Sequence, residues 1–530
     1  MIKSPRGTRD LLPPDTALWN FVEAAVRDVF RAYNFHEIRT PIFESTELFA
    51  RGVGEETDVV AKEMYTWYEG ADPDTTLLGA WYQQRHARYA GTVRRTAAAR
   101  QHISIDISGG SDTYLVELKH RPDIGVVDRL EARKHAWLAS HPDSKPPKLI
   151  LAVPTSEADR AKRMPLGEVI LEALSVEPGH ESPLSLTLRP ENTAGVVRAY
   201  IEHKLWDRGL NKLFYIGPQF RRERPQKGRY RQFYQIGAEV IGPAPSGSES
   251  PARDAEILEL LATLLDRVGI TNWTLELNSI GCPADRARFN EALRQALAPV
   301  VEKMCVDCQR RAVTNPLRVF DCKVPADQPI IETLPTITQF LDEDCRRHYE
   351  EVKSILNAVQ IPYLENPRLV RGLDYYTRTA FEFTHGALGA QNAILGGGRY
   401  DGLSEALGGP AAPGIGFAIG EDRLVLALTE SAESVVRKPD VYIAPLGAGM
   451  NREAARVARE LRRHDLVVDL GDESFRLKKS FEAADKMGAR YILIVGETEV
   501  AADAFALKHL ASGEQVTVPR AELAQRILQK

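Results

Sequence analysis

The 530-residue sequence lacks the long apolar segments and the disulfide framework of membrane and secreted proteins. No uninterrupted apolar run reaches the roughly 18 residues that a membrane-spanning helix needs. The opening stretch MIKSPRGTRDLLPPD has neither the apolar region nor the small-residue cleavage site of a secretory leader. Five cysteines, an odd number, favour reduced thiols over disulfide pairs. We therefore expect a cytoplasmic protein that makes no contact with membranes.

An overall excess of positive charge is also absent, since the formal net charge is −5 and the isoelectric point is near 6.2. These values alone do not indicate nucleic-acid binding. Phosphate contacts, however, depend on local charge, and one stretch is strongly basic. FRRERPQKGRYRQF, residues 220–233, contains five arginines and one lysine. Taken alone, such a run is more often a solvated loop than a binding site.

The chain is too long for one hydrophobic core, and its patterns divide it into several modules. A discontinuous body of strands and helices is interrupted by an α/β module between the turn-rich stretches EGADPD and EPGHESP. A mostly helical region follows later, and the C-terminal part alternates strands with helices, as in a small α/β domain with a mostly parallel sheet. The boundaries that we assign are 1–69, 184–282 and 363–430 for the body, 70–183 for the inserted module, 283–362 for the helical domain and 438–530 for the C-terminal domain.

The basic run joins two predicted strands, KLFYIG and FYQIGAEV, and so forms the tip of a hairpin. Gln235 and Glu239 are four residues apart on the second strand, and their side chains therefore point to the same face. Arg221 stands at the exit of the first strand. An arginine that faces polar and acidic groups can hold a polyphosphate at one end of a site and leave the acids for an ammonium group at the other.

Four segments resemble one enzyme family. YIGPQFRRERPQKGRYRQFYQIGAEVIG closely resembles motif 2 of class II aminoacyl-tRNA synthetases, in the form found in histidyl-tRNA synthetases. IRTPIFESTELF resembles motif 1, whose proline helps to build the dimer interface, and GIGFAIGEDRL resembles motif 3. LVRGLDYYTRTAFEF resembles a peptide characteristic of the histidine enzymes, and PRGTRDLLP and TLRPE agree as well. The resemblance covers about 1–69 and 184–530, and several motifs in order make chance agreement remote.

The resemblance implies an α+β fold, in which helices flank the antiparallel sheet of class II synthetases. A small helical insertion domain, a C-terminal α/β anticodon-binding domain and the extra inserted α/β module complete it. The resemblance also implies a homodimeric histidine–tRNA ligase. Such an enzyme activates L-histidine with ATP to histidyl-adenylate and pyrophosphate, and then transfers histidine to the 3′ end of tRNA(His). Mg²⁺ that bridges the phosphates is expected.

Activation needs cations more than a protein nucleophile, because the substrate's own carboxylate attacks the α-phosphate of ATP. By resemblance, Arg221 holds the substrate carboxylate and the α-phosphate. Arg371 contacts the α-phosphate from the other side and acts as the cation that other class II enzymes obtain from a metal. Arg423 holds the γ-phosphate, and Arg224 and Arg229 of the basic run can also meet ATP. The planar guanidinium group suits phosphate and carboxylate oxygens.

By resemblance, six residues receive the amine and the ring of histidine: Glu191, Thr193, Gln235, Glu239, Tyr375 and Tyr376. Two adjacent tyrosines taken alone are more often ordinary core. The three glycines of GGGRYDGL suit the close approach of a ligand. Two residues depart from the family pattern. Asn192 stands where glycine is common and adds bulk beside the pocket, and Tyr234 stands where many members have histidine.

RNA contacts are expected at two places. Gln226 and Lys227 in the basic run can reach the acceptor end of a tRNA, which in this family carries an extra guanosine, and we expect Gln226 to contact it. In the C-terminal domain, Arg476, Lys478 and Lys479 form either an RNA contact or a solvated helix face, and the sequence favours neither.

Cys305 and Cys308 are spaced like a pair of zinc ligands, and Cys322 follows them. A structural zinc site takes four ligands, usually as two close pairs, and here the second pair is missing. Cys282 or Cys345 could complete the set. Because the pattern is incomplete, we expect reduced thiols and no metal.

The inserted module contains IDISGGSDTYLVELKH, which places Asp106 on one strand and Glu117 and Lys119 on the next. With the following helix and the strand KLILAV, this order resembles the PD-(D/E)XK nuclease-like fold, where two acids hold a divalent cation and the lysine steadies the attacked phosphate. The helix expected at 81–101 lacks the acid that the fold often supplies there. A second helix is expected at 158–174. We favour a degenerate binding or structural module over a metal-dependent nuclease.

Two other functions compete with the ligase. A non-catalytic paralogue, such as the synthetase-like regulatory subunit of the first enzyme of histidine biosynthesis, would lack the RGLDYY peptide and the C-terminal domain, and this sequence has both. A nuclease or RNA-binding protein that used the synthetase body only as a tRNA dock would not need Arg221, Arg371 and Arg423, because docking requires no ATP site.

Overall fold

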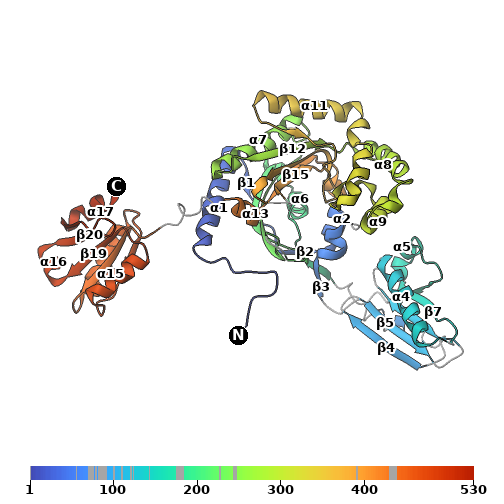
Figure 1. The fold of residues 1–530 in the computed structure, drawn as a ribbon, viewed down its shortest axis with the longest axis horizontal. Helices are drawn as coiled ribbons and strands as arrows, with labels where there is room; N and C mark the ends of the chain where they lie inside the picture. The colour runs from blue at the N-terminus through green and yellow to red at the C-terminus, as the bar shows by residue number, and fades with distance from the viewer. Residues whose placement is uncertain are drawn as a thin grey trace. The chain divides into compact units, whose positions relative to one another are not determined.

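The computed structural model describes residues 2–54, 57–69, 77, 80–81, 92–99, 102–108, 112–119, 122, 124–142, 144–174, 184–225, 228–242, 247–388, 392–428 and 438–529. The chain divides into two compact units, Met1–Asp10 with Ala25–Ala427 and Leu11–Ala24 with Leu428–Lys530. Figure 1 shows the elements in chain order. Among the described helices, none has the length and apolar character needed to cross a membrane.

An eight-stranded sheet lies at the centre of the first unit. In sheet order its strands are β1 (His36–Glu37), β10 (Lys212–Phe220), β11 (Gln232–Ile241), β16 (Gly414–Gly420), β15 (Ala393–Arg399), β14 (Thr377–His385), β12 (Trp273–Ser279) and β13 (Leu364–Glu365). From β10 to β12 every neighbouring pair is antiparallel, and only the edge strands β1 and β13 join in parallel. The antiparallel sheet implied by the resemblance is therefore confirmed.

Helices flank this sheet, as expected. Those of the body are α1 (Asp15–Ala32), α2 (Thr46–Val53), α6 (Thr193–Glu202), α7 (Pro251–Val268), α12 (Leu403–Ala406) and α13 (Glu421–Ala427). The start and end of α7 follow from local chemistry. The Ser250 side chain accepts a hydrogen bond from the Ala252 amide, Pro251 occupies the first turn, and Gly269 ends the helix in the left-handed region. Its buried apolar face anchors the helix beside the sheet.

The inserted module departs from a small three-stranded sheet, formed by β2 (Phe43–Ser45), β9 (Leu184–Leu188) and β3 (Tyr65–Glu69). The chain leaves this sheet after Glu69 and returns to it at Leu184, and these two residues face each other in the antiparallel pair of β3 and β9. The two ends of the module therefore meet at adjacent backbone positions, the geometry that lets a whole domain enter without disturbing a core.

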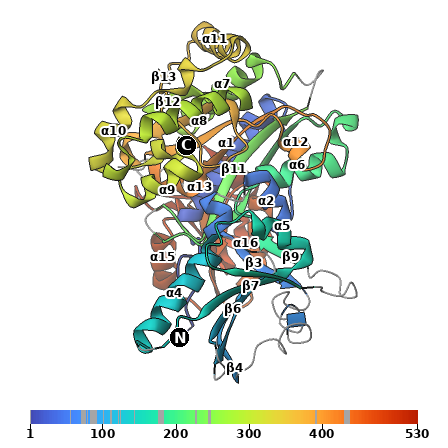
Figure 2. The same ribbon diagram turned by 90° about the vertical axis from the view of Figure 1, so that its right-hand side faces the viewer.

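The inserted module has its own five-stranded sheet. Its elements are β4 (Thr92–Ala99), β5 (His102–Ser108), β6 (Tyr114–Leu118), α4 (Ile124–Ser140), β7 (Lys148–Pro154), α5 (Ala158–Lys162) and β8 (Ile170–Leu174). β4, β5 and β6 are antiparallel, and β7 and β8 continue the sheet in parallel. In Figure 2, α4 lies along β6 and β7, which it contacts.

Two helix predictions in this module are wrong over part of their length. Within 81–101, Thr92–Ala99 is strand β4, because its hydrogen bonds with β5 outweigh the helix preference of its alanines and arginines. Within 158–174, the helix ends at Lys162 and Ile170–Leu174 is strand β8, paired with β7. Gly167, with φ of 54°, helps the chain to turn between them.

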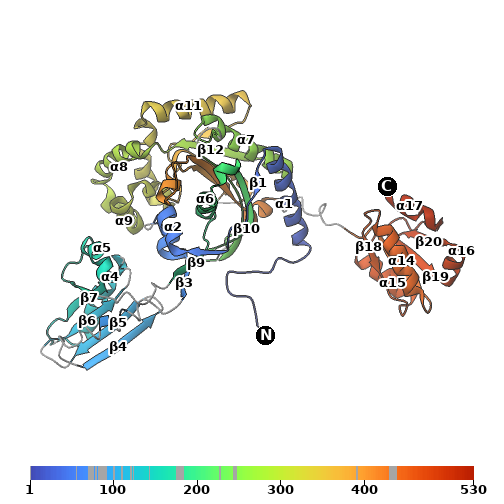
Figure 3. The same cartoon turned by 180° about the vertical axis from the view of Figure 1, so that it is seen from behind.

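The region 283–362 is mostly helical, as predicted. Its helices are α8 (Pro283–Leu297), α9 (Val306–Thr314), α10 (Gln328–Thr333) and α11 (Glu343–Ala358). α11 packs against α7 of the body, where Figures 1 and 3 show the two helices side by side. The other helices enclose a core of apolar side chains that includes Phe289, Leu293, Cys308 and Cys322.

The C-terminal unit contains an α/β domain with helices on both sides of a five-stranded sheet (Figure 3). Its elements are β17 (Val441–Leu446), α14 (Met450–Arg462), β18 (Val468–Leu470), α15 (Leu477–Lys486), β19 (Tyr491–Gly496), α16 (Glu497–Ala502), β20 (Ala504–His509), β21 (Gln515–Pro519) and α17 (Leu523–Leu528). Along β17, Val441 and Ile443 pack in the core under α14, whereas Tyr442 and Ala444 pack with residues of α15. The α/β prediction is confirmed, but only β18, β17 and β19 are parallel; β20 and β21 join in antiparallel order.

Candidate active site

A cleft of about 910 Å³ is lined by residues of β11, β15 and β16 together with loops around them. Four of the predicted arginines line it: Arg221, Arg229, Arg371 and Arg423. Arg224 is exposed and is not among the residues that line this cleft. Gln226 and Lys227 fall outside the described residues, so their predicted contacts stay predictions.

Arg221 is held at the edge of the cleft by the end of β10. Its Nε donates to the Pro190 carbonyl at 2.9 Å, and its Nη1 lies 3.7 Å from Glu223 Oε1. The guanidinium carbon lies 5.3 Å from the centre of the Phe233 ring. These contacts hold the arginine between the open cleft and the buried residues that follow Pro190.

Arg371 lines the cleft together with residues of strands β14 and β15. Its Nη1 donates to Glu382 Oε1 at 2.8 Å, and its guanidinium carbon lies 5.9 Å from the centre of the Tyr376 ring. A Cβ at Gly396 would come within 2.6 Å of both terminal nitrogens of Arg371. The first glycine of GGGRYDGL therefore provides the space that this arginine occupies.

Arg423 enters the cleft from α13, which begins directly after β16. Its Nε donates to the Ala393 carbonyl at 2.6 Å, at the start of β15. Burial, followed by the positive charge of Arg229, lowers the pKa of Arg423. Two cations that repel each other at this end of the cleft are suited to an anion with several charges.

Five residues predicted to bind histidine are not among those that line this cleft: Glu191, Thr193, Glu239, Tyr375 and Tyr376. Two of them are buried carboxylates. Glu239 Oε1 accepts a hydrogen bond from the Thr193 hydroxyl at 2.7 Å, and its Oε2 accepts one from the Tyr400 hydroxyl at 2.6 Å. Glu191 accepts hydrogen bonds from the backbone amides of Thr193 at 2.7 Å and Ala194 at 3.0 Å. All four donors are neutral, so the structure supplies hydrogen bonds to both acids without placing a cation on either.

Among the described residues neither acid forms an ion pair, and the pKa values of both acids are raised. Burial raises the pKa of Glu239 to about 8, and the charge of Glu191 acts in the same direction. Burial also raises the pKa of Glu191, although the two backbone amides and the charge of Arg221 lower it in part. A positively charged group that entered this pocket would favour the ionised carboxylates.

Aromatic rings surround the two acids. The ring centre of Tyr375 lies 4.7 Å from that of Tyr376 and 5.9 Å from that of Tyr400. Burial raises the pKa of Tyr375 well above its ordinary value, and the neighbouring charges of Glu191 and Glu239 act in the same direction. This region thus combines aromatic rings with two acids, a combination of groups that suits an imidazole ring and an ammonium group.

Gln235 lines the cleft and lies on the same face of β11 as Glu239, as predicted. Its Oε1 is buried and has no hydrogen-bond partner in the part of the chain that the structure describes. Opposite Glu239 on the neighbouring strand is Gly416, where a Cβ would collide with Oε2 of the acid. An unsatisfied acceptor beside an open cleft is a position for a donor of a ligand.

The two departures from the family pattern lie away from the cleft. Asn192 is buried, but its Oδ1 accepts a hydrogen bond from the Thr40 hydroxyl at 2.6 Å. The side chain is therefore directed toward Thr40. Tyr234 points to the other face of β11 from Gln235, and its amide donates to Asp422 Oδ2 at 3.0 Å. Neither residue lines the cleft among the residues described.

Sequence reasoning missed a buried charged network behind the site. Arg399 Nη1 donates to Asp254 Oδ1 at 2.6 Å, and the Thr379 hydroxyl donates to Asp254 Oδ2 at 2.5 Å. His348 Nε2 lies 2.8 Å from the same oxygen. The network ties α7 and α11 to strands β14 and β15. Arg399 stands in GGGRYDGL, but nothing in the sequence identifies Asp254 as its partner across 145 residues.

The predicted acids of the inserted module do come together, but around an arginine. Arg133 of α4 forms an ion pair with Asp106, and its Nη1 lies 2.6 Å from Glu117 Oε1. Ser104 donates to the same Glu117 oxygen at 2.5 Å. Lys119 follows β6, and its amide donates to the Ala152 carbonyl at 3.0 Å. A guanidinium group already stands where the nuclease interpretation requires a metal ion.

At the start of α15 in the C-terminal domain, Arg476, Lys478 and Lys479 are all exposed. Lys479 Nζ lies 3.8 Å from the centre of the Phe475 ring. The three cations and the aromatic ring share one short surface segment, an arrangement that suits the backbone and bases of an unpaired RNA strand.

Comparison with known proteins identifies close relatives over the whole length. The family model described as "Histidyl-tRNA synthetase" matches residues 166–424, and that described as "Anticodon binding domain" matches residues 440–530. The histidine–tRNA ligase of Koribacter versatilis is 56% identical over 525 residues, covering 99% of this chain and 95% of the relative. That of Solibacter usitatus is 46% identical over 529 residues, covering 99% of each. The crystal structure of apo S. aureus histidyl-tRNA synthetase is similar with a TM-score of 0.65 and 31% identity, covering 99% of this chain and 100% of that one.

Proposed function

Because the chain belongs to the histidyl-tRNA synthetase family, we propose that it is a histidine–tRNA ligase. It activates L-histidine with ATP to histidyl-adenylate and pyrophosphate, and then transfers histidine to the 3′ end of tRNA(His). One observation carries the proposal beyond family membership: the cleft lined by arginines also contains Gln235, on the same strand as the buried Glu239, which accepts hydrogen bonds from two hydroxyl groups. One site therefore offers cations to a triphosphate and anions to an amino acid.

The chemistry of the first step needs no nucleophile from the protein. The carboxylate oxygen of histidine forms a bond to the α-phosphorus of ATP, the bond from that phosphorus to the bridging oxygen breaks, and pyrophosphate leaves with the electron pair. Arg221, fixed by the Pro190 carbonyl, holds the attacking carboxylate and the α-phosphate. Arg371 neutralises the α-phosphate from the opposite side, and Arg423 holds the γ-phosphate. Cations placed before the reaction stabilise the transition state without reorganising.

Mg²⁺ takes oxygen ligands and is held in such sites largely by substrate phosphates. The Glu382 carboxylate lines the cleft beside Arg371, so the site offers an oxygen ligand of the kind that the ion prefers. When bound, the ion would neutralise charge on the departing pyrophosphate. Glu382 was not identified from the sequence. It stands in TAFEF, within the segment that resembles a peptide of the histidine enzymes, and that position is the signal that could have found it.

Histidine is selected by groups that the wrong amino acid leaves unpaired. Glu191 and Glu239 receive the ammonium group and the ring, together with Thr193. Gln235 offers its unsatisfied oxygen to a donor of the substrate. Tyr375 and Tyr376 bound the ring. A buried polar group that loses its partner costs more than a lost apolar contact, so this arrangement discriminates strongly against other amino acids.

For the second step, we assign the acceptor end of tRNA(His) to Gln226 and Lys227, and the anticodon to the C-terminal domain with its exposed Arg476, Lys478 and Lys479. Arg224 and Arg229 remain assigned to ATP, and Arg229 has the stronger support because it lines the cleft. The enzyme acts as a homodimer in the cytoplasm. The inserted module has a binding or structural role, since Arg133 neutralises its two acids.

Amino-acid-dependent exchange of labelled pyrophosphate into ATP tests the proposal directly. With the full-length protein, L-histidine should support exchange, and each of the other amino acids should give a signal at the level of the blank. The Tyr234→His variant, which restores the common family residue outside the cleft, is a control that should keep histidine-dependent exchange. Exchange that does not depend on histidine would overturn the assignment.

A further inference from the structure

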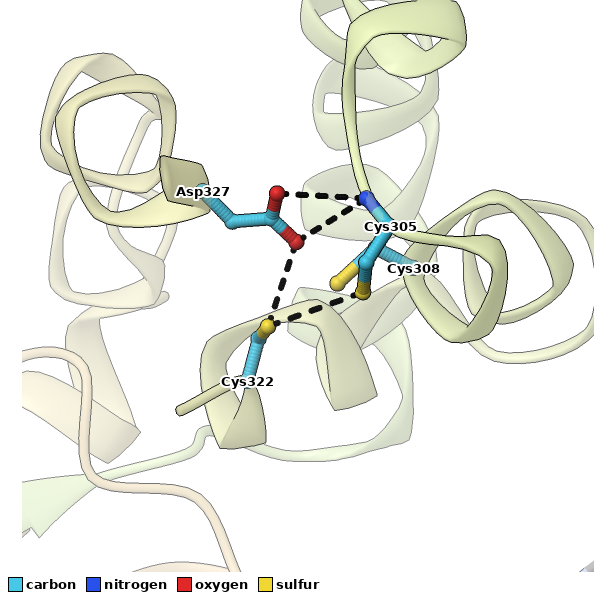
Figure 4. A group of neighbouring side chains, drawn as sticks. All are labelled: Cys305, Cys308, Cys322 and Asp327. Atoms are coloured by element: carbon cyan, nitrogen blue, oxygen red, sulfur yellow. Dashed lines mark hydrogen bonds between the residues drawn. The ribbon is translucent and has the colours of Figure 1, made fainter. Parts of the chain in front are cut away.

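Three cysteines and one aspartate of the helical domain converge on one point, and Figure 4 shows their side chains directed toward one another. One potential ligand atom from each of Cys305, Cys308, Cys322 and Asp327 lies within 4.8 Å of all the others. Cysteine spacing alone predicted an incomplete site, with Cys282 or Cys345 as the missing ligand. The structure instead brings in an aspartate that the spacing of cysteines could not reveal.

We propose that Cys305, Cys308, Cys322 and Asp327 form a structural site for one Zn²⁺ ion. Three thiolates and a carboxylate make a closed, four-ligand set, which is the composition of structural rather than catalytic zinc. Cys322 also lines the cleft that contains the predicted catalytic arginines, so the proposed ion lies at the border of that cleft. The proposal replaces the expectation of simple reduced thiols at these positions.

The distances fit a metal-centred tetrahedron and not a disulfide. With a Zn–S bond of about 2.3 Å, two sulfur ligands at the corners of a tetrahedron are about 3.8 Å apart. Cys305 Sγ and Cys322 Sγ are 3.9 Å apart. A disulfide would bring the two sulfurs to about 2.05 Å. Cys322 Sγ and Asp327 Oδ2 are 3.2 Å apart, so an ion would need to separate this pair by only a few tenths of an ångström.

The surrounding backbone holds the four side chains in place without an ion. Cys305 immediately precedes α9, and Cys308 lies in the first turn of that helix. The Asp327 carboxylate accepts hydrogen bonds from the Cys305 amide at 3.1 and 3.2 Å. The Val324 amide donates to Cys322 Sγ at 3.4 Å. Amide donors to sulfur and a positioned carboxylate are the outer contacts that orient metal ligands.

Burial adds a second, independent reason for a ligand. Cys308, Cys322 and Asp327 are 0%, 5% and 1% exposed. Zinc binds cysteine as the thiolate and displaces its proton, so the affinity should fall as the pH falls.

A second group of similar composition differs in its ligands. Cys282, Asp285, Asp342 and Cys345 also place potential ligand atoms within 4.8 Å of one another. Asp285 and Asp342 accept hydrogen bonds from the Cys282 amide at 3.1 Å and the Cys345 amide at 2.7 Å, and Asp285 also forms an ion pair with Arg288 at 2.6 Å. It contains only two sulfurs, and its acids cap α8 and α11. This group is the natural control for the first.

The segment between Cys308 and Cys322 contacts the loop that follows Arg371, and one of these contacts comes from Asn315, whose Nδ2 donates to Asp374 Oδ1 at 3.4 Å. The segment between Cys308 and Cys322 carries Arg318, whose Nη2 donates to the Gly372 carbonyl at 2.5 Å, directly beside Arg371. Zinc would tie the two ends of this segment together. It would thereby hold Arg318 where it supports the backbone next to a predicted catalytic arginine.

Metal analysis of the full-length protein tests the site. After incubation with Zn²⁺ and removal of unbound metal, we expect one zinc per chain. With Co²⁺ in place of Zn²⁺, we expect a thiolate-to-metal charge-transfer band and the visible bands of a tetrahedral site. Zinc content should fall at least tenfold in Cys308→Ser and in Cys322→Ser. The matched variants Cys345→Ser and Cys282→Ser should keep it.

Three results would overturn the proposal. The first is wild-type protein that binds no zinc and gives no cobalt–thiolate band, a measurement that does not depend on whether any variant folds. The second is loss of metal from Cys282→Ser or Cys345→Ser with retention in the other pair. The third is a Cys305–Cys322 disulfide found by mass spectrometry in protein purified under reducing conditions.

Discussion

Two pairs of acids in this protein have similar composition but opposite surroundings. In the body, the hydrogen bonds that Glu191 and Glu239 receive from the described residues come from hydroxyls and backbone amides. In the inserted module, Asp106 and Glu117 share the guanidinium group of Arg133. Within the described part of the chain, the first pair therefore has no ion-pair partner, whereas the second pair has one.

The comparison indicates that a pair of buried carboxylates is suited to bind a cationic ligand when its neighbours supply hydrogen bonds but no positive charge. A buried acid without a paired cation has a raised pKa and gains free energy when a cationic ligand arrives. A buried acid that is paired with arginine contributes to folding instead, and removal of the arginine leaves an uncompensated charge. The four predictions below test this contrast, beginning with the largest expected effect.

Replacing an arginine near each pair of acids should lower activity in one case and stability in the other. Arg371→Ala should lower pyrophosphate exchange by about 10²–10³-fold, because it removes a cation that stabilises the reacting phosphate. Its thermal unfolding should remain close to that of wild type. Arg133→Ala should do the reverse: exchange is kept, while the inserted module loses on the order of 3 kcal/mol of local stability. Hydrogen exchange of the amides in β5, β6 and α4 measures that loss.

The opposite outcomes for these two variants would contradict the proposed difference between the two pairs of acids. If Arg371→Ala unfolds the body, this arginine is structural and its catalytic assignment fails. If Arg133→Ala abolishes exchange, the inserted module takes part in activation.

Replacing an acid should likewise lower activity in the body but not in the inserted module. Glu239→Gln keeps the size of the side chain but removes its charge, so kcat/KM for histidine in the exchange reaction should fall about 100-fold. The matched change in the other pair, Glu117→Gln, should leave kcat/KM within about twofold, because distant sites act independently. Equal losses in the two variants would show that the pairs do not differ in function.

Glu239 should also leave a signature in the pH dependence of stability. Burial raises its pKa from 4.5 to about 8 in the folded chain, so the folded state holds its proton more tightly than the unfolded state. The stabilising contribution is complete below about pH 4.5 and is lost as the pH rises through about 8. Relative to Glu239→Gln, the ligand-free wild-type protein should therefore lose thermal stability between these values. A wild-type protein that instead gains stability relative to Glu239→Gln over this pH range would contradict the raised pKa of Glu239.

Removal of the whole inserted module should have the smallest effect on activity. Because Glu69 and Leu184 face each other in the β3–β9 pair, a two-residue Asn-Gly turn can replace residues 70–183. Aminoacylation should remain within about twofold of wild type, since the connection lies at the tip of a hairpin. A large fall in the rate, with the body still folded, would assign the module a role in the synthetase cycle.

The sequence predicted best where function depends on contiguous residues. The hairpin of β10 and β11 carries Arg221 at the end of one strand and Gln235 and Glu239 on one face of the other, as the two-residue period of a strand requires. The helix predictions for 81–101 and 158–174 failed where pairing with a neighbouring strand overrode local preference.

By itself, the sequence determined the family, the antiparallel body and most of the residues assigned to the site, because each motif keeps its chemistry within a few neighbouring positions. Only the tertiary structure decided which groups satisfy the buried charges. It paired Asp254 with Arg399, placed Arg133 between Asp106 and Glu117, and brought Asp327 to three cysteines. The physical reason is that a buried charge or thiol interacts with whatever the fold places within a few ångströms, and distance along the chain does not reveal that neighbour.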